Sequence, residues 1–274
     1  MAQYLSEHPD IFMATPKEPH HYNDDHVHGG FKDPRAYAAL FQNTEKKTVG
    51  EASVFYLYSR VAVPRIEKEC PNARYIVMLR NPLEMAPALH EQHVFSGYET
   101  CSEFEQAWNL QGPRRSGALA PPPGTDVQIL LYAEVCRQGE QLQRLYTHVP
   151  RERVLTIFNE DFRSEPLRVW RDVQAFLGEK DDGRTSFPPV NSAKKRKSKV
   201  LQHAKGSAIA LRRKFGIPPL GTGLLKRLEN WNVKDHKRGA LSPEMVTTLR
   251  TAFRADIDVL AQLTQRDLSH WLNG

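Results

Sequence analysis

The stretch IFMATPKEPHHYND, residues 11–24, gathers side chains that can take a proton and steer charge. Lys17 and Glu18 are adjacent, and His20 and His21 follow after one proline. A carboxylate beside a lysine is ionised near neutral pH, which is the form that a general base must have. The stretch is therefore either a solvated polar turn or the acid–base corner of an active site.

Two later segments are unbroken apolar runs that lead directly into charged residues. Tyr75–Leu79 precedes Arg80, and VLTIFN precedes the acidic pair Glu160 and Asp161. Continuous apolar runs are typical of parallel strands that helices cover on both faces, and ligands bind at the carboxyl ends of such strands. Arg80 also precedes a predicted helix, whose free N–H groups favour an anion. We therefore expect an anion site at Arg80, the alternative being a salt bridge to a neighbouring helix.

Helices and strands alternate along the chain, which indicates an α/β fold with a mainly parallel central sheet flanked by helices. GPRRSGALAPPPGTD, residues 112–126, is the clearest loop because it is rich in Pro and Gly. Leucine spacing predicts one long helix from Asp126 to about His148, with Gly139 at a close-packing point. The other predicted elements are a helix ended by Pro9, a strand in KTVGE, helices over 53–70, 82–97, 101–111 and 164–178, and a helix from Ser242-Pro243 to about Leu263.

Length and composition fit one domain over residues 1–274, with a basic, loop-rich segment over 182–240 and a helical portion over 241–272. No apolar run approaches the roughly 20 residues that cross a bilayer, and no secretory signal is visible, so we expect no membrane span. The three cysteines lie far apart, which argues against a disulfide framework and favours a cytoplasmic location. The sequence indicates no oligomeric state.

Basic residues are in excess, with a net charge of +6 and a pI near 9.2. KKRKSK, residues 194–199, and LRRKFG, residues 211–216, carry much of the surplus, which favours anionic partners such as phosphate groups. Non-specific nucleic-acid binding is one alternative, but no aromatic residue interleaves with these runs and no recognition-helix motif is present.

The histidine-rich segment HHYNDDHVH, residues 20–28, could bind a metal adventitiously. It lacks the spacing of the zincin metalloprotease motif, and we expect no functional metal.

Five segments stand out in order along the chain: HPDIFMATPKEPHHY, GEASVFYLYS, NARYIVMLRNPLEMAPALH, VLTIFNEDF and DLSHWL. Together they resemble the sulfotransferases that use 3′-phosphoadenosine 5′-phosphosulfate (PAPS), in the bacterial branch similar to heparan-sulfate sulfotransferases. The resemblance covers nearly the whole chain. It implies the P-loop-NTPase-like sulfotransferase fold and transfer of a sulfuryl group from PAPS to an acceptor hydroxyl or amine, with carbohydrate among the acceptors. No metal is required.

The resemblance also implies roles for single residues. Glu18 of the Lys-Glu-x-His stretch is the expected base, and Lys17 and His20 steer charge at the reacting oxygens. Arg80 of LRNP is expected to bind the 3′-phosphate of PAPS. The basic loop NSAKKRKSK completes that site, and Arg196 or Lys197 is the expected contact within it.

The sequence departs from the family pattern in two places. In the family, a strand and a glycine-rich loop that cradles the phosphosulfate precede HPxIFM, whereas Met1–Leu5 align with the helix after that loop. The first strand and the phosphate loop are therefore expected to be missing, leaving an exposed sheet edge and low stability. Ala88 stands where the family has a serine that donates to the 3′-phosphate, with Pro87 at an aromatic position. Losing one hydrogen bond of about 1.5–3 kcal/mol weakens binding roughly tenfold to a hundredfold.

Three interpretations of these departures stay open. The chain is an N-terminally truncated form of an active sulfotransferase, or a degenerate and inactive homologue that acts as a binding protein. In the third, His90 or the basic loop replaces the lost 3′-phosphate contacts. The predicted function is that of a sulfotransferase, with the inactive binding protein as the alternative and the nucleic-acid-binding protein as a further one.

Overall fold

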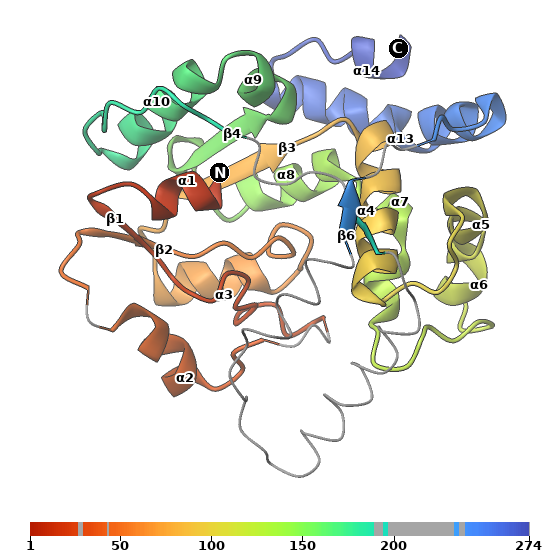
Figure 1. Cartoon of the computed structure of the whole chain (residues 1–274), viewed down its shortest axis with the longest axis horizontal. Helices are drawn as coiled ribbons and strands as arrows, with labels where there is room; N and C mark the ends of the chain where they lie inside the picture. The colour runs from red at the N-terminus through yellow and green to blue at the C-terminus, as the bar shows by residue number, and fades with distance from the viewer. Residues whose placement is uncertain (27–29, 43, 189–193, 197–232, 236–238, 274) are drawn as a thin grey trace.

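A computed structural model describes residues 1–26, 30–42, 44–188, 194–196, 233–235 and 239–273, the two short internal ranges by their backbone alone. The fold is α/β with parallel strands flanked by helices, as predicted (Figure 1). The helices are α1 Ala2–Ser6, α2 Pro34–Ala38, η1 Ala39–Phe41, α3 Ala62–Glu69, α4 Pro82–Ser96, α5 Phe104–Asn109, α6 Gln111–Arg115, η2 Val127–Leu130, α7 Tyr132–Val135, α8 Gln138–Tyr146, η3 Arg151–Arg153, α9 Asn159–Ser164, α10 Pro166–Leu177, α13 Pro243–Thr264 and α14 His270–Asn273.

Four of the described strands form two parallel pairs. β1 (Ile11–Met13) pairs with β2 (Thr48–Gly50), and β3 (Tyr75–Leu79) pairs with β4 (Val154–Phe158). Three of these four strands, β2, β3 and β4, were predicted, whereas β1 was not. Leu79 is fully buried, but Met78 is 38% exposed, so β3 is not covered on both faces as its continuous apolar run predicted. A third pair, β5 (Lys194–Arg196) with β6 (Val233–Asp235), is antiparallel.

The two parallel pairs form separate sheets among the described strands. Side-chain packing links them instead, because Tyr4 and Leu5 of α1 and Ile11 of β1 share a buried cluster with Ile157 of β4 and Trp170 of α10. Burial of apolar surface stabilises this junction without hydrogen bonds between the pairs. The central sheet is thus mainly parallel but interrupted.

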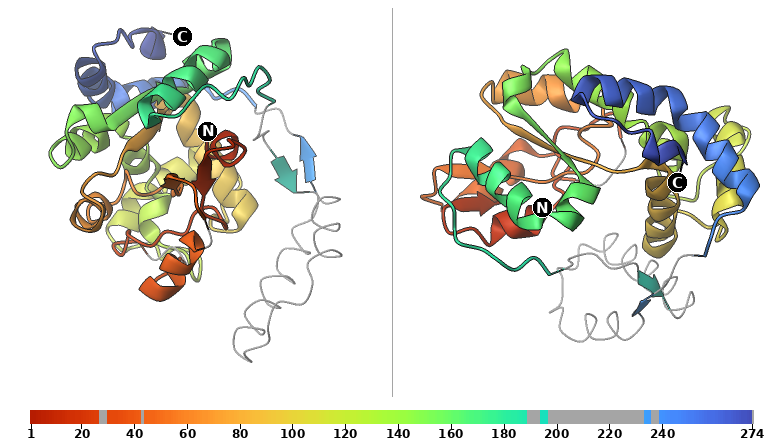
Figure 2. Two further views of the ribbon diagram at one scale, coloured as in Figure 1. Left: turned by 90° about the vertical axis from the view of Figure 1, so that its left-hand side faces the viewer. Right: turned by 90° about the horizontal axis from the view of Figure 1, so that it is seen from above.

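The main core lies where α13 crosses α8 beside α4 (Figures 1 and 2). Phe253 of α13 is fully buried, and its ring lies 5.9 Å from the ring of Trp108. Ser242 caps α13 by accepting a hydrogen bond from the Met245 N–H, as the Ser-Pro pair predicted. Trp170 and Trp271 are buried as well, so these tryptophans fill the interior.

The long helix predicted from Asp126 is wrong: the segment divides into η2, α7 and α8. Asp126 does cap η2, accepting from the Gln128 N–H at 3.0 Å. The chain breaks again before α8, because the Asp256 carboxylate of α13 accepts the N–H groups of Gly139 and Glu140 at 3.0 and 2.8 Å. A Cβ at Gly139 would lie 2.3 Å from the Asp256 backbone oxygen, which confirms the predicted close-packing point.

The predicted loop over residues 112–126 is partly helical, since α6 extends to Arg115. The cause is Arg114, whose buried guanidinium donates to both oxygens of Glu99 at 2.7 and 2.9 Å. Tyr132 donates to the same carboxylate at 2.9 Å. A buried charge needs such a partner, and the Arg114–Glu99 ion pair holds this turn against the core.

Among the described residues, no helix is both long and apolar enough to cross a membrane.

Candidate active site

The loop that follows β1 runs beside the segment that follows β2. The Ala14 N–H donates to the Gly50 carbonyl at 2.8 Å, and the Glu18 N–H donates to the Ala52 carbonyl at 3.0 Å. Glu18 and His20 both have left-handed backbone conformations, with φ of 64° and 49°. Such angles are uncommon for residues other than glycine and persist only where surrounding contacts hold them.

Lys17, Glu18 and His20 lie together, as the sequence predicted. The two Glu18 carboxylate oxygens have different partners: Oε1 lies 3.1 Å from Lys17 Nζ, and Oε2 lies 3.1 Å from His20 Nε2. The His20 side chain is buried at 4% exposure, while the Glu18 side chain is 30% exposed and the Lys17 side chain 53%. The carboxylate therefore has one face toward solvent and one toward the protein.

The electrostatics of this corner favour an ionised carboxylate. Burial by itself raises the pKa of Glu18, but the hydrogen bond from His20 and the charge of Lys17 outweigh it and hold the pKa below its ordinary value. Glu18 is thus ionised near neutral pH, in the protonation state that accepts a proton. The arrangement can act as a general base with a cation and an imidazole beside it.

A second carboxylate, Glu51, lies behind the corner and was missed by the sequence reasoning. Ser53 Oγ donates to Glu51 Oε2 at 2.7 Å, and Tyr56 also hydrogen-bonds this carboxylate. The Tyr37 hydroxyl lies 3.4 Å from Glu51 Oε1. The only signal in the sequence was that Glu51, Ser53 and Tyr56 lie in GEASVFYLYS, one of the segments that carry the resemblance.

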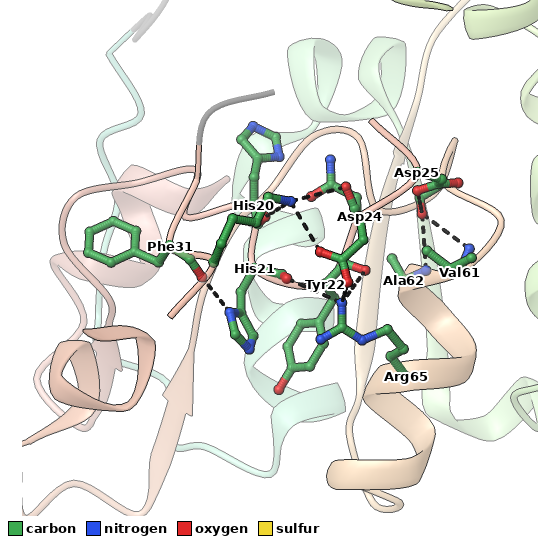
Figure 3. Close-up of polar contacts among 12 residues, drawn as sticks. His20, His21, Tyr22, Asp24, Asp25, Phe31, Val61, Ala62 and Arg65 are labelled. Atoms are coloured by element: carbon green, nitrogen blue, oxygen red, sulfur yellow. Dashed lines mark hydrogen bonds and ion pairs between the residues drawn. The ribbon is translucent and has the colours of Figure 1, made fainter. Parts of the chain in front are cut away.

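The loop beyond His20 is fastened to α3 and its N-terminal turn (Figure 3). Arg65 of α3 donates to the carbonyls of His21 and Tyr22 at 3.5 and 3.3 Å and pairs with Asp24. Asp25 accepts from the Ser59 hydroxyl at 2.6 Å, and that hydroxyl in turn accepts the Ala62 N–H at 3.0 Å. The described part of the histidine-rich loop, up to His26, therefore packs as part of the fold.

Arg80 lies at the carboxyl end of β3, directly before α4. The Gln138 side chain brackets its backbone, accepting the Arg80 N–H at 3.0 Å and donating to the Arg80 carbonyl at 2.6 Å. The guanidinium pairs with Glu84 one turn along α4, at 3.0 Å, with side-chain exposures of 30% and 47%. Asn81 caps α4 by accepting the Leu83 N–H at 2.9 Å. Within the described residues, no hydrogen bond or ion pair joins Arg80 to Glu18.

The remaining predicted cofactor contacts are only partly within the described residues. Lys197 lies outside them, and Arg196 is described by its backbone alone, as the last residue of β5. β5 lies against α4, the helix that carries Ala88 and follows Arg80 (Figure 1). The backbone of residues 194–196 thus lies near the helix that follows Arg80, the other residue predicted to contact the 3′-phosphate.

Glu160 and Asp161, the acidic pair after β4, bind the C-terminal segment of the chain. Arg266 donates to Asp161 Oδ1 at 2.7 Å and to Glu160 Oε1 at 2.9 Å. The Trp271 indole N–H donates to Glu160 Oε2 at 3.0 Å, and His270 lies 3.2 Å from the same carboxylate. The carboxylates of Glu160 and Asp161 are therefore already bound by side chains of the C-terminal segment.

Among the described residues, no group of three or more His, Cys, Asp or Glu could hold a metal ion.

The chain is similar to three known sulfotransferases, one by sequence and two by structure, while no protein-family model matches it. The chain is 30% identical over 81 residues to the membrane-associated sulfotransferase kil1 of Dictyostelium discoideum, covering 30% of this chain and 17% of that protein. The crystal structure of a sulfotransferase from Alicyclobacillus acidocaldarius matches with a TM-score of 0.69 and 24% identity, over 98% of this chain and 91% of that one. The sulfotransferase domain from the curacin biosynthetic pathway matches with a TM-score of 0.35 and 15% identity, over 54% of this chain and 44% of that one.

These findings confirm the resemblance at two levels. The chain has the sulfotransferase fold, because nearly all of it superposes on the bacterial enzyme. A segment of its sequence is also homologous to part of a curated sulfotransferase.

Proposed function

We propose that this protein transfers a sulfuryl group from PAPS to an acceptor hydroxyl or amine. The observation that carries the proposal is the corner in which Lys17 and His20 hold an ionised Glu18, on a chain with the sulfotransferase fold. A sulfuryl acceptor must lose a proton as its oxygen or nitrogen attacks sulfur. Glu18 is a partly exposed carboxylate that can take that proton.

The reaction balances with these groups alone. The acceptor oxygen or nitrogen bonds to sulfur, and the bond between sulfur and the 5′-phosphate oxygen breaks. Glu18 receives the acceptor proton, and adenosine 3′,5′-bisphosphate leaves with the bond electrons. Lys17 and the His20 imidazole lie on the two oxygens of Glu18 and stabilise negative charge nearby.

In this proposal, Arg80 binds the 3′-phosphate of the donor. Among the described residues, its guanidinium forms an ion pair with half-exposed Glu84 one turn away, and a phosphate dianion is a stronger partner for it. The N-terminus of α4 adds backbone N–H groups beside Arg80. Arg196 and Lys197 stay the proposed contacts from the basic loop, and Ala88 supplies none of the hydrogen bonding that a serine would.

The acceptor is proposed by its chemistry only, as a hydroxyl or an amine, with carbohydrates among the candidates. We propose no metal and no nucleic acid in the reaction. The thiols of Cys70, Cys101 and Cys136 are unpaired, which supports a reducing compartment such as the cytoplasm.

The test is transfer of label from sulfur-labelled PAPS to a panel that holds a polysaccharide with free amines, a simple sugar and a simple phenol. We expect label in at least one acceptor and release of adenosine 3′,5′-bisphosphate in equal amount. Binding of the bisphosphate without transfer to any acceptor would refute the transferase and favour an inactive binding protein. Neither binding at millimolar ligand nor transfer would refute both.

A further inference from the structure

The polar network behind the Glu18 corner has a carboxylate as its hub. Glu51 directly follows β2 and accepts hydrogen bonds from the Ser53 and Tyr56 hydroxyls. Each hydroxyl also accepts backbone N–H groups from the loop opposite. Ser53 Oγ accepts the His20 N–H at 3.1 Å, and the Tyr56 hydroxyl accepts the His21 N–H at 3.0 Å.

The direction of these bonds depends on the charge of Glu51. Burial raises the pKa of the Glu51 carboxyl, while the hydrogen bonds from Tyr56, Ser53 and Tyr37 favour its ionised form. When ionised, the carboxylate can only accept, so both hydroxyls direct their protons toward it. Their lone pairs then face the loop and accept the N–H groups of His20 and His21. Hydroxyls in such a chain are oriented and polarised by the carboxylate at its end.

The loop has a strained backbone at the point where the network holds it. Glu18 and His20 have positive φ angles, and non-glycine residues keep such angles only when surrounding contacts determine them. The His20 N–H bond to Ser53 is one such contact, and it fixes the residue whose imidazole binds Glu18. Glu51 therefore acts on Glu18 through the backbone of His20.

From this geometry we infer that Glu51 is a positioning residue for the Glu18 base, acting through Ser53 and Tyr56 to hold His20 in place. The inference rests on the proposed function, since Glu18 is a base only if the protein transfers a group. Glu51 itself need not touch either substrate. The Glu51 carboxylate determines the geometry of the Lys17–Glu18–His20 corner, not its chemistry.

The experiment compares Glu51→Gln with Tyr37→Phe, which removes a hydroxyl that bonds the same carboxylate and the Tyr22 side chain but accepts neither the His20 nor the His21 N–H. Two quantities are measured by NMR on the full chain near neutral pH: exchange rates of the His20 and His21 amides, and the titration midpoint of the Glu18 carboxyl. We expect Glu51→Gln to speed exchange of both amides roughly tenfold and to raise the Glu18 midpoint, with Tyr37→Phe close to the original protein. A purely structural role would lower the melting temperature without moving the Glu18 midpoint.

Two further variants keep the test decisive if Glu51→Gln does not fold. Ser53→Ala removes the acceptor of the His20 N–H, and Tyr56→Phe removes the acceptor of the His21 N–H. Faster exchange should therefore be confined to His20 in the first variant and should include His21 but not His20 in the second. Equal exchange in all variants, or identical behaviour of Glu51→Gln and Tyr37→Phe, would overturn the inference.

These readouts separate this inference from the proposed function. The exchange and titration measurements need neither PAPS nor an acceptor. Failure of sulfuryl transfer by the unsubstituted chain would refute the function, whereas an unmoved Glu18 midpoint in Glu51→Gln would refute the positioning role. Where transfer is measured, Glu51→Gln should lower kcat and leave the KM for PAPS unchanged, because Arg80 has no contact with this network among the described residues.

Discussion

The Glu18 corner and the Arg80 end of β3 are held in opposite ways. At the corner, neighbouring residues hold both the backbone and the side chain, because Lys17 and His20 bind the two oxygens of Glu18. At Arg80, the Gln138 side chain brackets the backbone, whereas the guanidinium, within the described part of the chain, has a partly exposed ion pair with Glu84. Exposed pairs of this kind contribute about 0–1 kcal/mol, so the guanidinium can exchange its partner at little cost.

The contrast fits the two tasks proposed for these regions. A general base must be oriented before the reaction, since misplacement lowers the rate steeply. A phosphate-binding cation needs only to be near its ligand and available to it. The predictions below test this division between a preorganised corner and an adaptable cation.

The largest effect is expected for Glu18→Gln, which keeps the shape of the side chain but removes its basicity. We expect kcat for sulfuryl transfer to fall by about 10²–10⁴-fold, the usual range for losing a general base. Affinity for adenosine 3′,5′-bisphosphate should not change. Glu45→Gln, at an exposed position, is the control and should leave both quantities unchanged. If Glu18→Gln lowered the affinity for the bisphosphate as much as it lowered kcat, the separate roles of Glu18 and Arg80 would be contradicted.

Ala88→Ser is expected to have a smaller effect in the opposite direction. It restores the hydroxyl that the family resemblance assigns to the 3′-phosphate, on the same helix that Arg80 precedes. A hydrogen bond to a charged group should raise the affinity for adenosine 3′,5′-bisphosphate by about tenfold in calorimetry. Ala252→Ser, at a half-buried position of α13, is the matched control. Unchanged affinity would mean that Ala88 does not face the nucleotide.

The pH dependence of Glu18 should follow from its lowered pKa. The carboxylate is stabilised in the folded state, so this stabilisation is fully present above the unfolded pKa and is lost as pH falls through the folded value. We expect the NMR titration midpoint of Glu18 to lie below the ordinary value of 4.5 in the folded chain and to return toward it in urea. A folded midpoint above 4.5 would show that burial outweighs the partners.

The smallest effect is expected for Lys17→Met. Lys17 is 53% exposed, whereas the buried His20 donates directly to Glu18, so His20→Ala should raise the Glu18 midpoint more than Lys17→Met does. Solvent screens the exposed cation, and its contribution should stay within a few-fold in the ionisation constant of Glu18. The reverse order would indicate that Lys17, not His20, keeps Glu18 ionised.

The sequence predicted best where local pattern and tertiary structure agree. The apolar run at Tyr75–Leu79 is β3 as predicted, and Lys17, Glu18 and His20 meet because they are neighbours in one loop. It failed where a distant side chain decides the structure. The helix predicted from Asp126 breaks because Asp256 of α13 binds the first turn of α8, and no local pattern contains that contact.

The network behind the corner could not be predicted for a similar reason. Glu51 follows a glycine in a polar stretch, and an isolated Glu in such a position is usually a surface residue. Its role depends on the pairing of β1 with β2, which brings residues 51–56 against residues 18–22. A long-range parallel pairing of three-residue strands leaves little trace in the sequence.

The central claim is that this fold binds the nucleotide of a sulfuryl donor at Arg80. Calorimetric titration of adenosine 3′,5′-bisphosphate into the chain, with Arg80→Ala and the exposed control Arg168→Ala beside it, tests this most directly. We predict binding by the original chain, a loss of about 10–100-fold in Arg80→Ala, and no change in Arg168→Ala. Unchanged affinity in Arg80→Ala, or no binding by the original chain at millimolar ligand, would contradict it.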